Sequence, residues 1–224
     1  MQYVANKDNI AKRIAGIFQS GDVVNLGIGL PTLVVNHLPP DVTIILQSEN
    51  GLMGLGPAPA KGEENWDMVN AGGAPISVQP GGCFFDSATS FGIIRGGHVD
   101  YTVLGVLEVD QEGNLANYKV PGKMVPGMGG AMDLVTGAKN VIVAMEHATK
   151  DGGAKILKRC DLPLTAAGKV SAIATELAFF RFIDGVLTLT EIAPGVTLEE
   201  IRAKTEADFV VSPTCRQMQL PAES

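Results

Sequence analysis

The sequence predicts an α/β fold: a three-layer α/β/α sandwich around a mostly parallel sheet, with a C-terminal β-hairpin. Short apolar runs at residues 42–46 and 141–145 have the length and composition of buried strands in a parallel sheet. Segments between such runs carry apolar residues at helical spacing. In the last third, two β-like runs flank Asp184-Gly185, a dipeptide favoured in two-residue hairpin turns.

Length and composition predict a single domain over residues 1–224. A chain of 224 residues with 46% hydrophobic residues can bury a real core, and its 27 glycines indicate many tight turns. No repeat, low-complexity run or linker divides it. The tail from about residue 212 is expected to be loose.

Charge and hydropathy narrow the class of partner. The net charge is −7 without a basic cluster, which argues against nucleic acid or anionic lipid as a partner. No apolar run reaches about 18 residues and residues 1–9 lack the apolar core of a signal peptide, so no membrane segment is expected. The three cysteines lack metal-type spacing and are interpreted as reduced thiols of a cytoplasmic protein.

The first elements are predicted from periodicity and capping. One helical face carries Ile10, Ile14, Ile17 and Phe18. Asn6 or Asp8 is expected to cap this helix and Gly21 to end it. A strand over residues 23–26 and a helix over residues 32–38 follow.

Residues 27–31, Gly-Ile-Gly-Leu-Pro, lie at the predicted strand-to-helix turn. Gly27 and Gly29 would leave backbone N–H groups facing an approaching anion, and Pro31 suits a first helical turn. A dinucleotide-binding fingerprint needs glycine at its sixth position, where Thr32 stands. A tight turn without a ligand is the remaining alternative.

The next stretch, Gln-Ser-Glu-Asn-Gly at residues 47–51, places a carboxylate after a buried strand. Loops at the carboxyl ends of parallel strands bind the ligands of α/β proteins. Glu49 is therefore a candidate nucleophile, general base, metal ligand or cap. Ser48 is a poor candidate for a hydrolase nucleophile, because Leu46 stands where the nucleophile elbow needs glycine.

The remaining elements follow from the same signals. Residues 52–66 show no period and are predicted to form a long loop over the site. A strand over 74–79 is expected to stop at Pro80, and a helix capped by Asp86 or Ser87 to run to about Ile94. The other expected elements are strands over 101–109, 140–146, 177–183, 186–192 and 208–211, and helices from 131 to 135 and from a capping box at 197–200 to 205.

Three motifs in this order resemble the β subunit of the class I coenzyme A transferases, which include the 3-oxoacid and acetate/acetoacetate CoA-transferases. They are the 27–31 turn, Ser48-Glu49-Asn50-Gly51, and Gly-Met-Gly-Gly-Ala-Met-Asp at residues 127–133. The resemblance extends from about Val24 to Val211. It implies that Glu49 is the nucleophile and that residues 127–133 contact the CoA-bearing side.

The resemblance also implies a reaction. CoA would move from a short-chain acyl-CoA (acetyl-, butyryl-, succinyl- or acetoacetyl-CoA) to an acid such as acetoacetate or acetate, through a glutamyl-CoA thioester on Glu49. Coenzyme A is then a substrate, with no permanently bound cofactor and no metal. An α subunit is implied to complete the CoA site, in an α2β2 assembly, which suits an acidic chain whose substrate is polyanionic.

The remaining candidate residues have stated alternatives. Backbone N–H groups of Gly27, Gly29, Gly129 and Gly130 are candidates for the oxyanion hole, and Ser48 and Asn50 are candidates for positioning or for a simple turn. The resemblance implies that Gly81, Gly82, Phe84 and Phe85 line the acyl pocket, although at least one phenylalanine is expected to be a core residue. Lys123 is the nearest cation for an acid or phosphate, unless it is a solvated loop lysine, and Met128 is grouped with these substrate-binding candidates.

Two other function classes are open at this point. One is a nucleotide-binding oxidoreductase domain, disfavoured by Thr32. The other is a non-catalytic CoA-binding subunit, disfavoured by the intact motif around Glu49.

Overall fold

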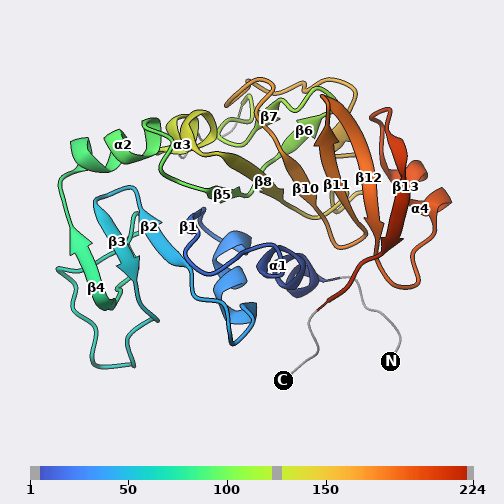
Figure 1. Cartoon of the computed structure of the whole chain (residues 1–224). Helices are drawn as coiled ribbons and strands as arrows, with labels where there is room; N and C mark the ends of the chain where they lie inside the picture. The colour runs from blue at the N-terminus through green and yellow to red at the C-terminus, as the bar shows by residue number, and fades with distance from the viewer. Residues whose placement is uncertain (1–5, 123–127, 221–224) are drawn as a thin grey trace.

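The computed structural model describes residues 6–122 and 128–220 and is built around a ten-stranded sheet (Figure 1). In order across the sheet the strands are β13 (Val210–Gln217), β12 (Val186–Ile192), β11 (Ala178–Ile183), β10 (Ala172–Ala174), β8 (Asn140–Ala144), β5 (Tyr101–Leu104), β1 (Val23–Leu26), β2 (Ile45–Ser48), β3 (Leu52–Leu55) and β4 (Val78–Phe84).

The centre of the sheet is parallel and both flanks contain antiparallel pairs. β10, β8, β5, β1 and β2 are paired in parallel, whereas β11 and β12 on one side and β3 and β4 on the other are joined by antiparallel pairing. β11 and β12 form the predicted hairpin. Its two turn residues, Asp184 and Gly185, have φ of 51° and 78°, as a type I′ turn requires.

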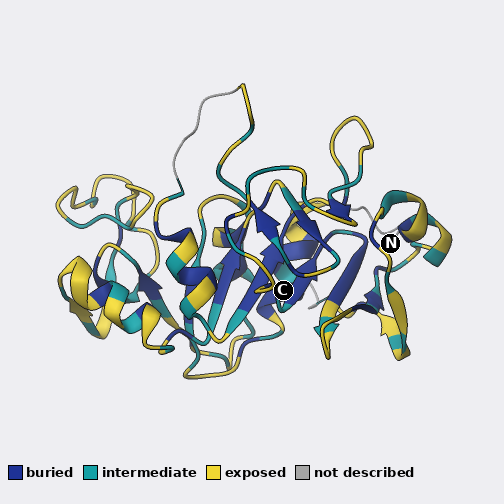
Figure 2. Cartoon of the chain, turned by 90° about the horizontal axis from the view of Figure 1, so that it is seen from above, coloured by how far each residue is buried: buried dark blue, intermediate teal, exposed yellow. Residues whose placement is uncertain are grey.

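The central strands are buried on both faces, which makes the fold three-layered (Figure 2). Side chains alternate along β8: Val141 and Val143 point into one core cluster, and Ile142 and Ala144 into another. The second cluster also holds residues of α1 (Lys7–Ala15) and of the 3-10 helix η1 (Leu30–His37). The predicted α/β sandwich is confirmed.

The opposite face is covered by three groups of elements. They are α2 (Ser87–Arg95) with α3 (Ala131–Gly137), the helix α4 (Leu198–Lys204), and a small sheet of β7 (Leu115–Ala116), β6 (Glu108–Asp110) and β9 (Ile156–Leu157). Three predicted N-caps are confirmed. The side chains of Asn6, Asp86 and Thr197 each accept a hydrogen bond from a backbone N–H in the first turn of α1, α2 and α4, respectively. None of the described helices has the length and apolar character needed to cross a bilayer.

Several predicted boundaries are wrong. α1 ends at Ala15 with Gly16 as its C-cap, and not at Gly21. The helix expected over 32–38 is a 3-10 helix, and β2 begins at Ile45, later than the apolar run suggested. The long strand expected over 101–109 divides between two sheets, because β5 ends at Leu104 and β6 begins at Glu108.

The strands at both edges of the sheet extend beyond their predicted ends. β4 continues through Pro80 to Phe84, and β13 continues through Pro213 to Gln217, so residues 212–217 are a strand and not a loose tail. Both are edge strands, where a residue without an N–H removes no ladder hydrogen bond on the outer side. Residues 52–55, expected to open a loop, form β3.

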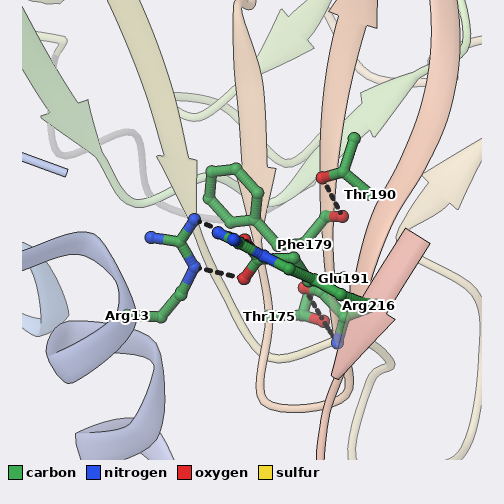
Figure 3. A network of polar contacts seen from close by, with 7 residues as sticks. Arg13, Thr175, Phe179, Thr190, Glu191 and Arg216 are labelled. Atoms are coloured by element: carbon green, nitrogen blue, oxygen red, sulfur yellow. Dashed lines mark hydrogen bonds and ion pairs between the residues drawn. The ribbon is translucent and has the colours of Figure 1, made fainter. Parts of the chain in front are cut away.

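A buried ion pair joins α1 to β12 (Figure 3). Nε and Nη2 of Arg13 lie 2.5 Å and 2.9 Å from the two carboxylate oxygens of Glu191, and the Arg13 guanidinium lies 4.3 Å from the ring centroid of Phe179. Arg216 adds a contact of 3.0 Å to Glu191 from the exposed side. Burial opposes ionisation of Glu191, but the hydrogen bonds and charges of Arg13 and Arg216 together outweigh it, so the pKa of Glu191 lies below its usual value.

We predict that Arg13→Ala lowers the free energy of unfolding by about 3–5 kcal/mol, because it leaves the carboxylate of Glu191 buried without its main partner. Arg216→Ala, a matched loss of a guanidinium from the same carboxylate, removes a largely exposed contact and is expected to cost less than about 1 kcal/mol. Urea unfolding of the two variants measures the difference. Equal losses would contradict the assignment of stability to the buried pair.

Candidate active site

Glu49 lies directly after β2, at the carboxyl end of the parallel part of the sheet. The chain turns back at once into antiparallel β3, with Ser48 opposite Leu52. Gly51 makes this turn possible, because its φ is 120° and a Cβ there would collide with the carbonyl oxygen of Phe85. Glu49 is thus held on a tight β-turn, at the edge predicted to bind ligands.

A buried side chain of β1 contacts the carboxylate. Nδ2 of Asn25 lies 3.1 Å from Oε2 of the half-buried Glu49 and 2.8 Å from Oε1 of Gln47. Nε2 of Gln47 donates in turn to Oγ of Ser90, at 3.0 Å. The sequence analysis missed these three residues. A signal was present: Asn25 is a polar residue inside an otherwise apolar strand, and Gln47 occupies the paired position on β2.

The third motif reaches Glu49 through Gly130. A Cβ at Gly130 would lie 3.3 Å from Cγ of Glu49 and 3.2 Å from Cζ of Phe91, so this backbone packs closely against the carboxylate side chain. Gly129 precedes it with φ of 52°. Met128 is half-buried at the start of this described segment, and Lys123 lies outside the described residues.

The two glycines of the 27–31 turn differ in their backbone hydrogen bonding. The N–H of Gly27 donates to the carbonyl of Val103 at 2.8 Å, which extends the β1–β5 ladder and removes Gly27 from the oxyanion candidates. Gly29 has φ of 89°, and its N–H has no acceptor among residues 6–122 and 128–220. Because a 3-10 helix follows, the expected α-helix N-terminus is absent at this turn.

Ser48 and Asn50 hold a neighbouring turn in place. Oγ of Ser48 accepts the N–H of Ala71 at 3.0 Å, and Nδ2 of Asn50 donates to the carbonyl of Val69 at 2.8 Å. Ser48 is 4% exposed, which further disfavours a hydrolase nucleophile. The segment beside Glu49 is therefore residues 69–74, whereas the long loop was predicted over residues 52–66.

The four candidates for the acyl pocket lie on or after the edge strand β4. Gly82 packs closely against Gly54 of β3, because a Cβ on Gly54 would lie only 2.8 Å from the Cα of Gly82. Gly81 has a positive φ of 88°. Phe84 is 60% exposed and Phe85 is half-buried, so the expectation that at least one is a core residue is wrong. The backbone of Phe85 lies beside the Glu49 turn, since its N–H donates to the carbonyl of Gly51.

The sequence is similar to those of known coenzyme A transferases. The family model for coenzyme A transferase matches residues 7–204. The β subunit of the acetate CoA-transferase of Haemophilus influenzae is 62% identical over 96% of each chain. One subunit of the probable succinyl-CoA:3-ketoacid coenzyme A transferase of Bacillus subtilis is 53% identical, over 92% of this chain and 95% of that protein.

A solved structure has the same fold. The acyl-CoA transferase YdiF from Escherichia coli O157:H7 superposes with a TM-score of 0.77 and 25% identity over 98% of this chain. This chain spans 44% of YdiF, less than half of its length. The resemblance seen in the three motifs is confirmed, and the nucleotide-binding oxidoreductase alternative is not supported. The chain belongs to the coenzyme A transferase family.

Proposed function

We propose that this chain is the β subunit of a CoA-transferase in which Glu49 carries CoA as a glutamyl thioester. The observation that carries the proposal is the half-buried carboxylate at the carboxyl end of β2, held by a buried amide on one side and closely approached by Gly130 on the other. The family membership and the relatives that are named as subunits of CoA-transferases support it.

The reaction exchanges one activated acyl bond for another. An oxygen of Glu49 attacks the acyl carbon of the donor thioester, the C–S bond breaks, and CoA leaves as a thiolate, which gives a mixed anhydride of the acyl group and Glu49. The thiolate then attacks the Glu49 carboxyl carbon, and the first acid leaves as its carboxylate. The acceptor carboxylate reverses both steps, so no bond energy is lost to water.

A glutamate suits this role because a carboxylate is ionised at neutral pH and needs no general base. Each attack creates an oxyanion that hydrogen-bond donors must stabilise. The N–H groups of Gly29, Gly129 and Gly130 are proposed for the acyl oxyanion. The turn at residues 69–74, tied to Ser48 and Asn50, is proposed to limit access of water to the anhydride and the thioester.

The proposed substrates are short-chain acyl-CoA and carboxylates. Acetate and a 3-oxo acid such as acetoacetate are favoured because the relatives at 62% and 53% identity are named for acetate and for succinyl-CoA and 3-ketoacids. Phe84, Phe85 and residues 81–82 remain the proposed lining of the acyl pocket. Lys123 and Met128 are proposed substrate contacts on the CoA side.

The proposed partner is an α subunit, in an α2β2 complex. The relatives that match over nearly their whole length are each named as one subunit of an enzyme, and YdiF is a chain more than twice as long. A net charge of −7 is unfavourable for binding polyanionic CoA alone, so the partner is expected to supply cationic contacts. A cytoplasmic location stays a prediction.

The first experiment tests the covalent intermediate. The chain is co-expressed with its α subunit, incubated with acetoacetyl-CoA or acetyl-CoA without acceptor, and analysed by intact mass. We expect CoA attached to this chain, loss of the adduct in Glu49→Gln, and a fall in kcat of at least about 10³-fold, because the nucleophile is removed. Glu63→Gln, the same change on the exposed loop, is expected to behave as wild type. An adduct on the Glu49→Gln chain would contradict the proposal.

A second experiment tests the close approach of Gly130. Gly130→Ala places a methyl group against Cγ of Glu49 and the ring of Phe91, so the carboxylate shifts and kcat is expected to fall by about 10²-fold. Gly92→Ala, where a Cβ meets nothing within 4 Å in α2, serves as the control and is expected to leave kcat unchanged. Steady-state kinetics of the two complexes measure this. Equal rates for the two variants would remove Gly130 from the site.

A further inference from the structure

The β11–β12 hairpin and the start of β13 expose apolar side chains on one face of the sheet. Ile183 pairs with Val186 across the hairpin, and Val210 pairs with Thr188, two residues after Val186. Paired residues and residues two apart in a strand point to the same face, so Ile183, Val186 and Val210 are neighbours. Their exposed fractions are 45%, 47% and 51%, respectively. A single exposed apolar residue needs no explanation, but three adjacent ones form a patch.

The other face of these strands belongs to the core. Phe182 and Leu187, which pair beside Ile183 and Val186, belong to or pack against the core cluster that also contains Ile201 of α4. The alternation of side chains therefore turns the exposed apolar residues away from this cluster. We call the three apolar residues, together with Arg181 and Asp184, the hairpin patch.

Two residues of opposite charge flank the apolar part of the hairpin patch. Arg181 lies two residues before Ile183 and shares its face of the sheet, and Asp184 follows Ile183 at the exposed hairpin turn. The Arg181 guanidinium lies 5.3 Å from the ring centroid of Phe179. Neither charged residue has an ion-pair partner among residues 6–122 and 128–220. The patch thus carries one uncompensated charge of each sign, on either side of Ile183.

The hairpin patch is separated from Glu49 in two directions. Across the sheet, the strands β11, β10, β8, β5 and β1 lie between β12 and β2. β11 runs antiparallel to β10 and sets Arg181 opposite Ala172, the first residue of β10, so the hairpin turn projects beyond the amino end of the parallel strands. Glu49 follows β2 at their carboxyl end. A subunit that completes the site around Glu49 therefore meets a different edge of the sheet.

We propose that the hairpin patch joins two copies of this chain in the α2β2 complex. The proposal rests on the proposed function, from which it takes that assembly. Under two-fold symmetry a surface meets itself, so that each copy supplies both members of every contact. With the axis at Ile183, Asp184 of each copy lies against Arg181 of the other. The apolar side chains between these two pairs are removed from water.

The order of the charges favours a second copy over an unrelated partner. A surface that binds itself needs an apolar centre with opposite charges on its two sides, and the hairpin patch has this order. Two chains of net charge −7 repel each other, so a stable contact also needs local attraction, which the two Asp184–Arg181 pairs supply. Val210 lies on the edge strand β13, where exposed apolar residues favour association with another chain.

The first test measures the mass of the complex with the α subunit by light scattering. Val186→Asp and Val210→Asp place a carboxylate in the hairpin patch and are expected to convert α2β2 into αβ. Each αβ pair is expected to keep forming the CoA adduct, because Glu49 lies at the opposite edge of the sheet. Melting temperatures show that the variants are folded.

Val211→Asp is the matched control. Val211 is the next residue of β13, it is 36% exposed, and it pairs with Leu189 of the core cluster, so its side chain points away from the hairpin patch. This variant is expected to remain α2β2.

The second test reverses the charges. Arg181→Glu and Asp184→Lys each set like charges against one another, and each is expected to raise the Kd between αβ pairs by at least about 10-fold. The double variant restores the attraction and is expected to return to within about threefold of the wild-type Kd. Lysine at the φ of 51° of residue 184 is equally strained in the single and double variants, so strain does not explain a recovery.

The third test identifies the chain on the other side of the contact. With residue 183 at the axis, the thiols of Ile183→Cys face each other, and mild oxidation is expected to link two copies of this chain. Val211→Cys, on the opposite face, is expected to give no more of this product than wild type.

Four results would overturn the inference. They are α2β2 retained in both Val186→Asp and Val210→Asp, equal dissociation of Val211→Asp and Val210→Asp, no recovery in the double charge variant, and a crosslink from Ile183→Cys to the α subunit. If the aspartate variants do not fold, the charge-reversal result decides. A wild-type complex that is αβ at every concentration would also overturn the inference. The proposed function is judged separately, since it fails only if the wild-type complex forms no CoA adduct.

Discussion

The site depends on the parallel pairing of β1 with β2. This pairing sets Asn25 opposite Gln47 and brings the end of β2, with Glu49, beside a buried amide of the neighbouring strand. Side chains alternate between the faces of a strand, so a shift of one residue would turn Asn25 to the opposite face of the sheet. Burial of apolar residues on both faces of the central strands makes such a shift costly. The geometry around the carboxylate is thus fixed by the packing of the whole sheet.

Each residue of the Ser-Glu-Asn-Gly motif has its own physical role in this frame. Ser48 and Asn50 bind the backbone of residues 69–71 on either side of Glu49. Gly51 allows the backbone of Phe85 to approach where a side chain would collide. Three of the four residues therefore build the surroundings of the fourth. A turn that is held from both sides limits movement of Glu49, which suits a group that must meet a substrate at a defined distance.

What the sequence could predict follows from how local each feature is. The turn at Glu49, the caps of three helices and the Asp184-Gly185 hairpin depend on a few adjacent residues, and they were predicted correctly. The two edge strands were predicted, but their continuation through Pro80 and Pro213 was missed, because a position at the sheet edge is a property of the topology. The contact between Asn25 and Glu49 depends on register, which no single stretch of sequence contains. Sequence patterns thus located the candidate reactive residue, whereas only the assembled sheet revealed its donor.

The environments of three carboxylates support the choice of Glu49 as the proposed reactive group among them. Glu191 is held by two guanidinium groups, and Asp110, fully buried, accepts N–H groups from Glu112, Asn114 and Cys160. Strong donors of this kind stabilise the charge and occupy the lone pairs that an attack would need. Among residues 6–122 and 128–220, Glu49 instead receives one neutral donor, on one oxygen, and it is half-buried beside a glycine. A carboxylate that is oriented but not neutralised keeps an oxygen available for attack. This difference in hydrogen bonding favours Glu49 as the proposed nucleophile and a structural role for the other two carboxylates.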